Sequence, residues 1–450
     1  MAGSYFSDLL STIAERGRSL LGLDTPADAA RQASGLVGLC EQLLSGRGEA
    51  SGVALAREVL DRFATLDAVA RLGFFTALAE RFGPDRERLD RAVTAWREHH
   101  DERRAADLHF GSEPRRQELL RRLNRAPGGT AALVAMREAL LADARGNPAL
   151  QEIDRDFLHL LASWFNRGFL VLERVDWSSP ALVLEKIIRY EAVHEIHDWD
   201  DLRRRIDPVD RRCYAFFHPA LVAEPLIFVE VALTTAIPVA IQPLLAADRD
   251  PVAPQAARTA VFYSISNCQQ GLAGVSFGNF LIKQVAEELR RELPKLETFV
   301  TLSPVPGLMR WLHEVVQPAL GADDRALLAA LDEPRWIDDA ELAQRIRRLV
   351  EPRTAQYFLE SRDDKGRALD PVARFHLGNG ARLERINWLG DQSAKALAQS
   401  AGVMVNYLYD LAEIERNHEA YANQGDVVAA AQVRKLLRAV PRKKTGAQPA

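Results

Sequence analysis

A glycine-rich loop after a strand-like run is the first part of this sequence that could do chemistry. The run 259–266 (TAVFYSIS) leads into a loop that contains Gly271, Gly274 and Gly278. Glycines let backbone N–H groups approach a ligand closely, and the N-terminus of a following helix attracts anions. The glycine spacing matches neither a P-loop nor GxGxxG. The loop is therefore a candidate cradle for a diphosphate, with an ordinary strand-to-helix turn as the alternative.

Two other side chains suit nucleophilic or acid–base work. Ser303 stands in 302–307 (LSPVPG), between a short β-rich run and a helical pattern. It either caps that helix, with Pro304 in the first turn, or faces a ligand crevice. His376 lies between apolar residues beside an Asn-Gly pair. Imidazole is the usual acid–base group near neutral pH, and a hydrogen-bonded core histidine is the alternative.

The remaining polar clusters are weaker candidates. The stretch 194–201 (HEIHDWDD) carries two histidines three residues apart, which could share a helix face, but it is not HExxH. We predict no metal site there and interpret it as a solvated helix end. The run Arg203 to Arg205 is also typical of a solvated face. Cys40, Cys213 and Cys268 form no CxxC pair, which indicates free thiols in a reducing compartment.

Composition excludes several classes of protein. The chain has 450 residues, 47% hydrophobic and 27% charged, as in an ordinary soluble globular protein. The net charge of −4 shows no overall excess of positive charge of the kind that indicates nucleic-acid binding. The sequence has no run of about 18 apolar residues, so we predict no membrane span. The first 22 residues also lack the apolar core of a secretory signal. We therefore expect a cytoplasmic protein with neither nucleic-acid nor membrane partners.

The first 170 residues have helical periodicity and predict a helical bundle. Apolar residues recur at spacings of three and four between 54 and 82, which indicates one helical stripe with a possible break near Gly73. Gly83-Pro84 ends this pattern. Further helices are expected at 85–98 and 131–144.

Strand-like runs alternate with helical patterns after residue 170, which indicates a mixed sheet with helices on its faces. The runs 212–217 and 225–233 predict a buried hairpin. Asn379-Gly380 suggests a type I′ turn in a second hairpin, formed by 372–376 and 381–387. Other strands are expected at 259–266, 298–302 and 403–409. Other helices are expected at 277–293, 308–316, 339–349 and 392–399.

Eight stretches, in the family's own order, resemble malonyl-CoA decarboxylase. They are 163–180 (SWFNRGFLVLERVDWSSP), 190–199 (YEAVHEIHDW), 211–221 (RRCYAFFHPAL), 224–234 (EPLIFVEVALT), 262–283 (FYSISNCQQGLAGVSFGNFLIK), 302–312 (LSPVPGLMRWL), 370–389 (DPVARFHLGNGARLERINWL) and 402–411 (GVMVNYLYDL). The resemblance extends from about residue 60 to 415 and is weaker in the helical part. It implies an α+β protein, with an all-helical N-terminal bundle and a mixed-sheet domain of the GNAT acetyltransferase type.

The resemblance also implies a domain division and a set of site residues. Residues 1–170 would form a structural or oligomerising domain, and 171–450 a catalytic domain. The residues from about 440, basic and then small and polar, independently predict a disordered tail. The family's catalytic serine, histidine and tyrosine fall on Ser303, His376 and Tyr409. Its acyl-CoA loop falls on Gln270, Gly271, Leu272, Ala273, Gly274, Val275, Ser276, Phe277, Gly278 and Asn279. Where some relatives carry Glu in this loop, this chain has Ser276.

The implied reaction is the conversion of malonyl-CoA to acetyl-CoA and CO2. The CoA thioester is then the substrate, and no metal or other cofactor is required. We expect a homodimer or homotetramer. An acyl-CoA-dependent N-acetyltransferase and a malonyl-CoA sensor without turnover are the alternatives, because a fold alone does not define an activity.

Overall fold

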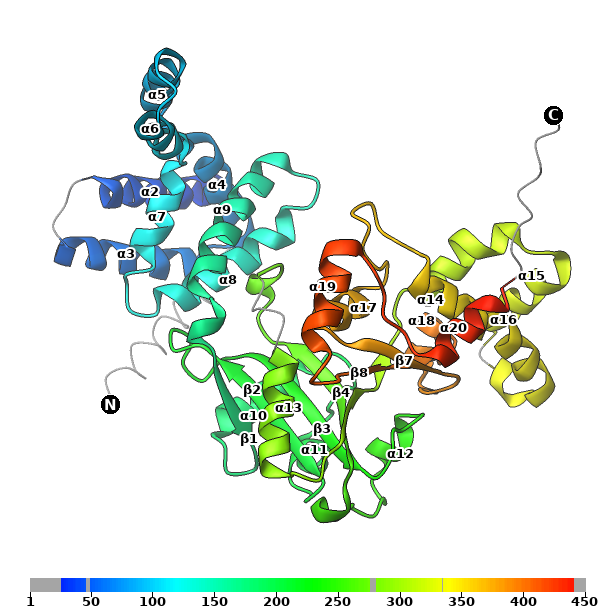
Figure 1. The fold of residues 1–450 in the computed structure, drawn as a ribbon. Coiled ribbons are helices and arrows are strands. Elements are labelled where there is room, and N and C mark those ends of the chain that lie inside the picture. Colours follow the sequence, from blue (N-terminus) through cyan, green and yellow to red (C-terminus); the bar gives the residue numbers. More distant parts are fainter. Residues whose placement is uncertain (1–25, 46–48, 276–280, 334, 441–450) are drawn as a thin grey trace, which may run out of the picture. The chain divides into compact units, whose positions relative to one another are not determined.

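The computed structural model describes residues 26–45, 49–275, 281–333 and 335–440. Within these ranges, the chain forms two compact units (Figure 1). The helical unit contains residues up to Phe169 together with 218–222 and the loop from Gln269. The sheet unit contains the other described residues. A basic tail is expected from about residue 440, and residues 441–450 lie outside the described part of the chain.

The helical unit contains eight α-helices in the described part of the chain. They are α2 (Pro26–Leu44), α3 (Glu49–Ala64), α4 (Ala68–Arg81), α5 (Arg86–Glu98), α6 (Glu102–Ser112), α7 (Arg115–Leu123), α8 (Gly129–Asp143) and α9 (Pro148–Trp164). Asp67, Asp85, Asp101 and Asn147 cap α4, α5, α6 and α9, since each side chain accepts from a backbone N–H of the first turn. The Asp and Asn residues that cap these helices mark their first turns in the sequence.

The break expected near Gly73 is wrong. The apolar stripe divides instead between Ala64 and Ala68, where Asp67 Oδ1 accepts from the N–H of Ala70 at 2.7 Å. Gly73 lies inside α4, and a Cβ there would make ordinary contact with Ala33 at 3.6 Å. A strong N-cap therefore defines the helix boundary, and one glycine inside a helix is tolerated.

The sheet unit is built on eight strands in the described residues. They are β1 (Val171–Val175), β2 (Arg211–Phe217), β3 (Pro225–Thr234), β4 (Thr259–Asn267), β5 (Thr298–Thr301), β6 (Ser303–Pro304), β7 (Arg382–Asn387) and β8 (Met404–Leu408). The order is β1-β2-β3-β4-β5-β8-β6, with β7 also paired to β8. Strands β1 to β4 are antiparallel neighbours, whereas β4 and β5 are parallel. The predicted mixed sheet and its first hairpin, β2 and β3, are confirmed.

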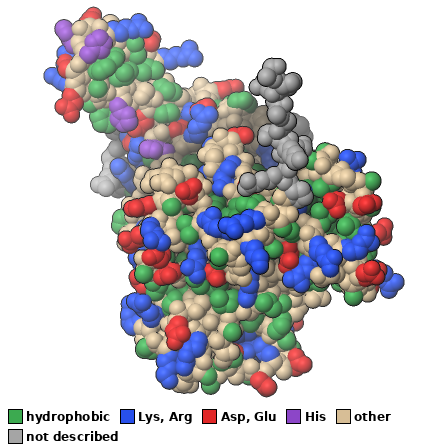
Figure 2. All heavy atoms as spheres, turned by 45° about the vertical axis from the view of Figure 1, so that its right-hand side comes forward, with side chains coloured by type: hydrophobic (Ala, Val, Ile, Leu, Met, Phe, Trp, Pro, Cys, Tyr) green, Lys and Arg blue, Asp and Glu red, His purple; other side chains and the backbone are tan. Residues whose placement is uncertain are grey.

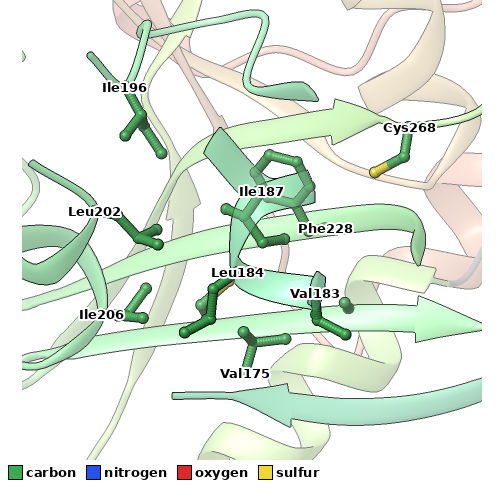
Figure 3. Close-up of a cluster of buried hydrophobic side chains, with 11 residues drawn as sticks. Val175, Val183, Leu184, Ile187, Ile196, Leu202, Ile206, Phe228 and Cys268 are labelled. Atoms are coloured by element: carbon green, nitrogen blue, oxygen red, sulfur yellow. The ribbon is translucent and has the colours of Figure 1, made fainter. Parts of the chain in front are cut away.

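Helices cover the sheet on both faces, as the nearly continuous burial of β2, β3 and β4 requires. The α-helices are α10 (Ala181–Tyr190), α11 (Trp199–Ile206), α12 (Gln242–Leu245), α13 (Leu281–Glu292), α14 (Leu308–Trp311), α15 (Ala322–Ala329), α16 (Ala340–Leu359), α17 (Pro371–Gly378), α18 (Ala394–Ser400), α19 (Ile414–Gln424) and α20 (Ala431–Arg438). Figure 3 shows one core cluster, in which apolar side chains of α10 and α11 meet Phe228 of β3.

The second predicted hairpin is wrong in its first arm. Residues 372–376 belong to helix α17, and only 381–387 contributes a strand. Gly380, at φ +80°, ends the helix: its N–H donates to Leu377 O and the N–H of Ala381 donates to His376 O. This is the Schellman pattern of a helix C-terminus. Asn-Gly thus supplies positive φ to a helix cap instead of a hairpin turn.

The surface and the thiols agree with the composition. Acidic and basic side chains are interspersed over the face drawn in Figure 2. Cys40, Cys213 and Cys268 are free, as predicted, and all three are buried. Among the described helices, we find no segment that combines the length and apolar content of a membrane crossing.

The end of α17 yields a stability prediction. A Cβ at Gly380 would lie 2.1 Å from the carbonyl oxygen of Ile414, whereas Gly366, at a similar φ of +75°, has open space around it. Gly366→Ala should cost only the left-handed backbone strain, about 1–2 kcal/mol. Gly380→Ala should cost more, because a backbone carbonyl must also move. Urea unfolding of the two variants measures this difference, and equal losses would contradict the cap geometry.

Candidate active site

Three side chains from separate elements of the sheet unit form one buried cluster. Ser303 lies in β6, His376 lies in the last turn of α17, and Tyr409 directly follows β8. Ser303 Oγ is 3.1 Å from His376 Nε2, and His376 Nδ1 is 2.8 Å from the Tyr409 hydroxyl. The structure therefore brings together the serine, histidine and tyrosine that the sequence singled out.

Ser303 does not cap a helix, so that reading of its position is wrong. Its peptide pairs with Val405 of β8, and helix α14 begins only at Leu308, after Gly307. Strand pairing on this side fixes the backbone and leaves the hydroxyl free to meet His376. The side chain is 5% exposed.

Hydrogen bonds assign the direction of the chain from tyrosine to serine. Thr301 Oγ1 accepts from the N–H of Tyr407 at 3.1 Å and from the Ser303 hydroxyl at 2.8 Å. Since the Ser303 proton points to Thr301, Ser303 Oγ accepts from Nε2–H of His376. The free lone pair of Nδ1 then accepts from the Tyr409 hydroxyl. His376 is thereby assigned the Nε2–H tautomer.

Burial keeps this cluster uncharged. Desolvation lowers the pKa of His376 to about 3 and raises the pKa of Tyr409 well above its ordinary value. The imidazole is stacked on the ring of Tyr407, with 4.6 Å between centroids and 24° between planes. At neutral pH the cluster is therefore a chain of neutral donors, which can meet developing negative charge without first losing a proton to water.

Asp370, which the sequence analysis missed, holds in place two segments that carry the cluster. It caps α17, since Oδ1 accepts from the N–H of Ala373 at 2.9 Å. Burial raises its pKa to about 6, although the N–H groups of Ala373, Val372 and Gly307 act in the opposite direction. Asp370 thus faces both the helix of His376 and the loop that follows Ser303. Its signal was present, because Asp followed by Pro is typical of a helix start.

A cavity of about 230 Å³ opens directly on Ser303 and His376. Its walls are mainly apolar and come from β4, from the loop around β6 and from the first turn of α17. They include Phe262, Tyr263, Ile265, Leu302, Val372 and Phe375, with Asn267 as a further polar group. Such a lining suits a small acyl group and excludes much of the water around it.

The predicted acyl-CoA loop is only partly described. Gln270 to Leu272 form a 3-10 turn within the helical unit, and Arg137 Nη1 donates to Gly271 O at 2.8 Å. A Cβ on Gly271 would lie 2.0 Å from Val134 O, so this glycine is needed for close packing on α8. Gly274 has φ +79°. Ser276, Phe277, Gly278 and Asn279 lie outside the described residues.

The two histidines at 194–197 do not share a helix face. Residues 191–198 are irregular, with His194 buried and His197 exposed. Desolvation lowers the pKa of His194 to about 4, so it stays neutral. Across the described ranges, no group of three His, Cys, Asp or Glu side chains is placed to hold a metal ion.

Comparisons with known proteins connect this chain to one family. The family model described as "Malonyl-CoA decarboxylase N-terminal domain" matches residues 82–165, and that for the C-terminal domain matches 168–447. The mitochondrial malonyl-CoA decarboxylase of Anser anser anser is 40% identical over 71% of this chain and 69% of its own length. The mouse protein is 36% identical over 73% of this chain and 72% of its own length.

Solved structures agree with these matches. The crystal structure of malonyl-CoA decarboxylase from Rhodopseudomonas palustris is 59% identical, with a TM-score of 0.87 over 90% of this chain and 99% of that one. The Agrobacterium vitis protein is 55% identical, with a TM-score of 0.86 over 89% of this chain and 99% of that one. The resemblance inferred from the eight stretches is confirmed, and the chain belongs to the malonyl-CoA decarboxylase family.

Proposed function

We propose that this protein is a malonyl-CoA decarboxylase that converts malonyl-CoA to acetyl-CoA and CO2. Family membership supports the activity, since the two family models match residues 82–165 and 168–447. The observation that carries the proposal is the neutral hydrogen-bond chain of Ser303, His376 and Tyr409 at the end of a small apolar cavity. It supplies proton donors where decarboxylation needs them.

The reaction defines what the site must do. Cleavage of the bond to CO2 leaves its electron pair on the adjacent carbon, as a thioester enolate. Neutral donors stabilise such developing charge best in a site that excludes water. A carboxylate that leaves water for an apolar cavity also loses solvation that favours its charged state. One proton must then reach the carbon.

Each polar side chain takes one part of this work. When substrate binds, the Ser303 hydroxyl rotates from Thr301 to donate to the malonyl carboxylate. Nε2–H of His376 provides the proton, directly or through the Ser303 hydroxyl. Tyr409 donates to Nδ1 and so keeps the tautomer that carries the proton on Nε2. The net reaction consumes one proton, which solvent returns to His376 between turnovers. This route uses no carboxylate in the loop, consistent with Ser276 at that position.

The loop from Gln270 to Asn279 is proposed to bind the diphosphate of CoA. The glycine spacing and the family resemblance support this role, and Gly271 also has a packing role. A homodimer or homotetramer and a cytoplasmic location remain predictions from the sequence.

When purified protein is incubated with malonyl-CoA alone, acetyl-CoA and CO2 should form in equal amounts. Chromatography of the CoA esters measures the acetyl-CoA. His376→Asn and Ser303→Ala should lower kcat by about 10²–10⁴-fold and leave the binding of CoA nearly intact. His197→Asn is the matched control, since that imidazole is exposed. Binding of malonyl-CoA without turnover would move the function to sensing or to acyl transfer to an amine. Full activity of His376→Asn would remove His376 from the mechanism.

The pH profile should separate Asp370 from His376. His376, with a pKa of about 3, should contribute no change in kcat between pH 5 and 8. Asp370, with a pKa of about 6, should lower kcat as pH falls below 6. The neutral carboxyl costs less to bury, but it is a weaker acceptor for the backbone N–H groups that position the first turn of α17. Steady-state kinetics of Asp370→Asn should lack this acidic limb.

Protein stability gives the control for this pH experiment. The folded-state pKa of Asp370 lies above its ordinary value, so between about pH 4 and 6 the folded state binds more protons than the unfolded state. Asp370 therefore adds stability as pH falls through this window. A loss of activity that tracks unfolding would contradict the assignment.

A further inference from the structure

A second cavity in the sheet unit, of about 150 Å³, lies where α11 ends and β2 begins. Its charged lining consists of four arginines and one aspartate, which are Arg204, Arg205, Arg211, Arg249 and Asp201. A second aspartate, Asp210, does not line the cavity but pairs with Arg211 and Arg249. We propose that this arginine pocket binds a small phosphate-type oxyanion, free in solution, at a place separate from the substrate cavity.

The pocket has more cationic than anionic groups. Asp210 is held by Arg249, whose Nη2 is 3.0 Å from Oδ1. Asp201 is shared by Arg204, at 3.4 Å, and Arg205, at 3.3 Å. Two carboxylates, of which only Asp201 lines the pocket, are therefore shared among four guanidinium groups. This excess of positive charge is what a multiply charged oxyanion would neutralise.

Arg211 makes the pocket specific for an anion. It is 2% exposed, and its hydrogen bonds go to the backbone carbonyls of Asp210 and Leu244. Its nearest carboxylate oxygen, Oδ2 of Asp210, is 3.6 Å away and already receives a hydrogen bond from Arg249. A buried guanidinium without a carboxylate of its own is costly, and an entering oxyanion would offset that cost.

Glu230 does not supply the missing negative charge near pH 7. Its Oε2 lies 3.5 Å from Arg205 Nη1 in the core behind the pocket. Burial and the nearby Glu191 raise the pKa of Glu230 to about 8, although Arg205 acts in the opposite direction. Even an ionised Glu230 would leave four guanidinium groups against three carboxylates, so the pocket keeps an excess of positive charge.

Size and position favour a free oxyanion over the substrate's phosphates. The volume is well below the roughly 300–1,000 Å³ of pockets that hold drug-sized ligands, and suits one tetrahedral anion. Arg211 pairs with Ala232, and Ala232 with Val261, near the start of β4. The glycine loop leaves the opposite end of that strand, after Asn267. Arg211 also lies over the ring of Tyr263, 5.9 Å from its centroid, and Tyr263 lines the substrate cavity.

Isothermal titration calorimetry of the full chain with sodium phosphate tests the proposal, with sodium chloride of equal ionic strength as the reference. We expect saturable binding to one site per chain. Arg204→Gln should raise Kd by about tenfold, the effect of losing one charge-assisted hydrogen bond. The Kd of Arg204→Lys should lie between those of Arg204→Gln and the parent protein, because lysine keeps the charge but lacks the paired N–H donors of the guanidinium group.

Arg203→Gln is the matched control. Arg203 is the neighbouring residue of α11, has similar exposure and lies over the ring of Trp177 instead of in the pocket. It should leave the Kd for phosphate unchanged. Absence of saturable binding, or equal weakening by Arg203→Gln and Arg204→Gln, would overturn the proposal. Thermal unfolding of each variant shows whether a loss of binding reflects a loss of folding.

Competition identifies the source of the phosphoryl group. Saturating CoA should leave the Kd for phosphate unchanged. If CoA displaces phosphate and CoA without its 3′-phosphate does not, the pocket binds the substrate's 3′-phosphate, and the assignment to a free oxyanion is wrong.

Discussion

Burial of a neutral imidazole is the constraint on which the candidate site depends. His376 is 3% exposed, is stacked on Tyr407, and is bounded by hydroxyl groups at both ring nitrogens. A charged imidazole would lose its hydration there, so the ring stays neutral and its tautomer is set by its partners. The same dry surroundings make a donor effective against charge that develops on a bound thioester. Burial of His376 therefore decides both its protonation state and its effectiveness as a proton donor.

The elements around His376 fix both its helix and its neighbours. Asp370 begins α17 and Gly380 ends it, so the helix that carries the imidazole is fixed at both ends. Gly307 admits Tyr357 close to the loop after Ser303, since a Cβ there would lie 2.5 Å from the tyrosine hydroxyl. Strand β8 then places Tyr409 on the far side of the ring. Precise placement of donors is worth much of a catalytic effect, and here it comes from local capping and strand pairing.

Sequence reasoning succeeded where the signal was local and failed where two structures share one signal. Buried strands such as 225–233 and capped helices such as 85–98 have patterns that few other structures produce. Asn379-Gly380 needs positive φ in a hairpin and at a helix end alike, so the pair alone could not distinguish them; Asp370-Pro371 would have done so.

The arginine pocket shows the limit of sequence reasoning in another form. Arg203 to Arg205 has the composition of a solvated face, yet Arg205 is 6% exposed. Its neighbours Arg211 and Arg249 come from separate segments, so only the folded sheet brings them together.

The protonation state of His376 is the central claim, and nitrogen NMR of histidine-labelled protein measures it directly, with His376→Asn used to assign the signal. We predict a proton on Nε2, an unprotonated Nδ1 and no titration of His376 between pH 5 and 8. An imidazole that carries its proton on Nδ1, or that titrates near its ordinary pKa, would contradict it.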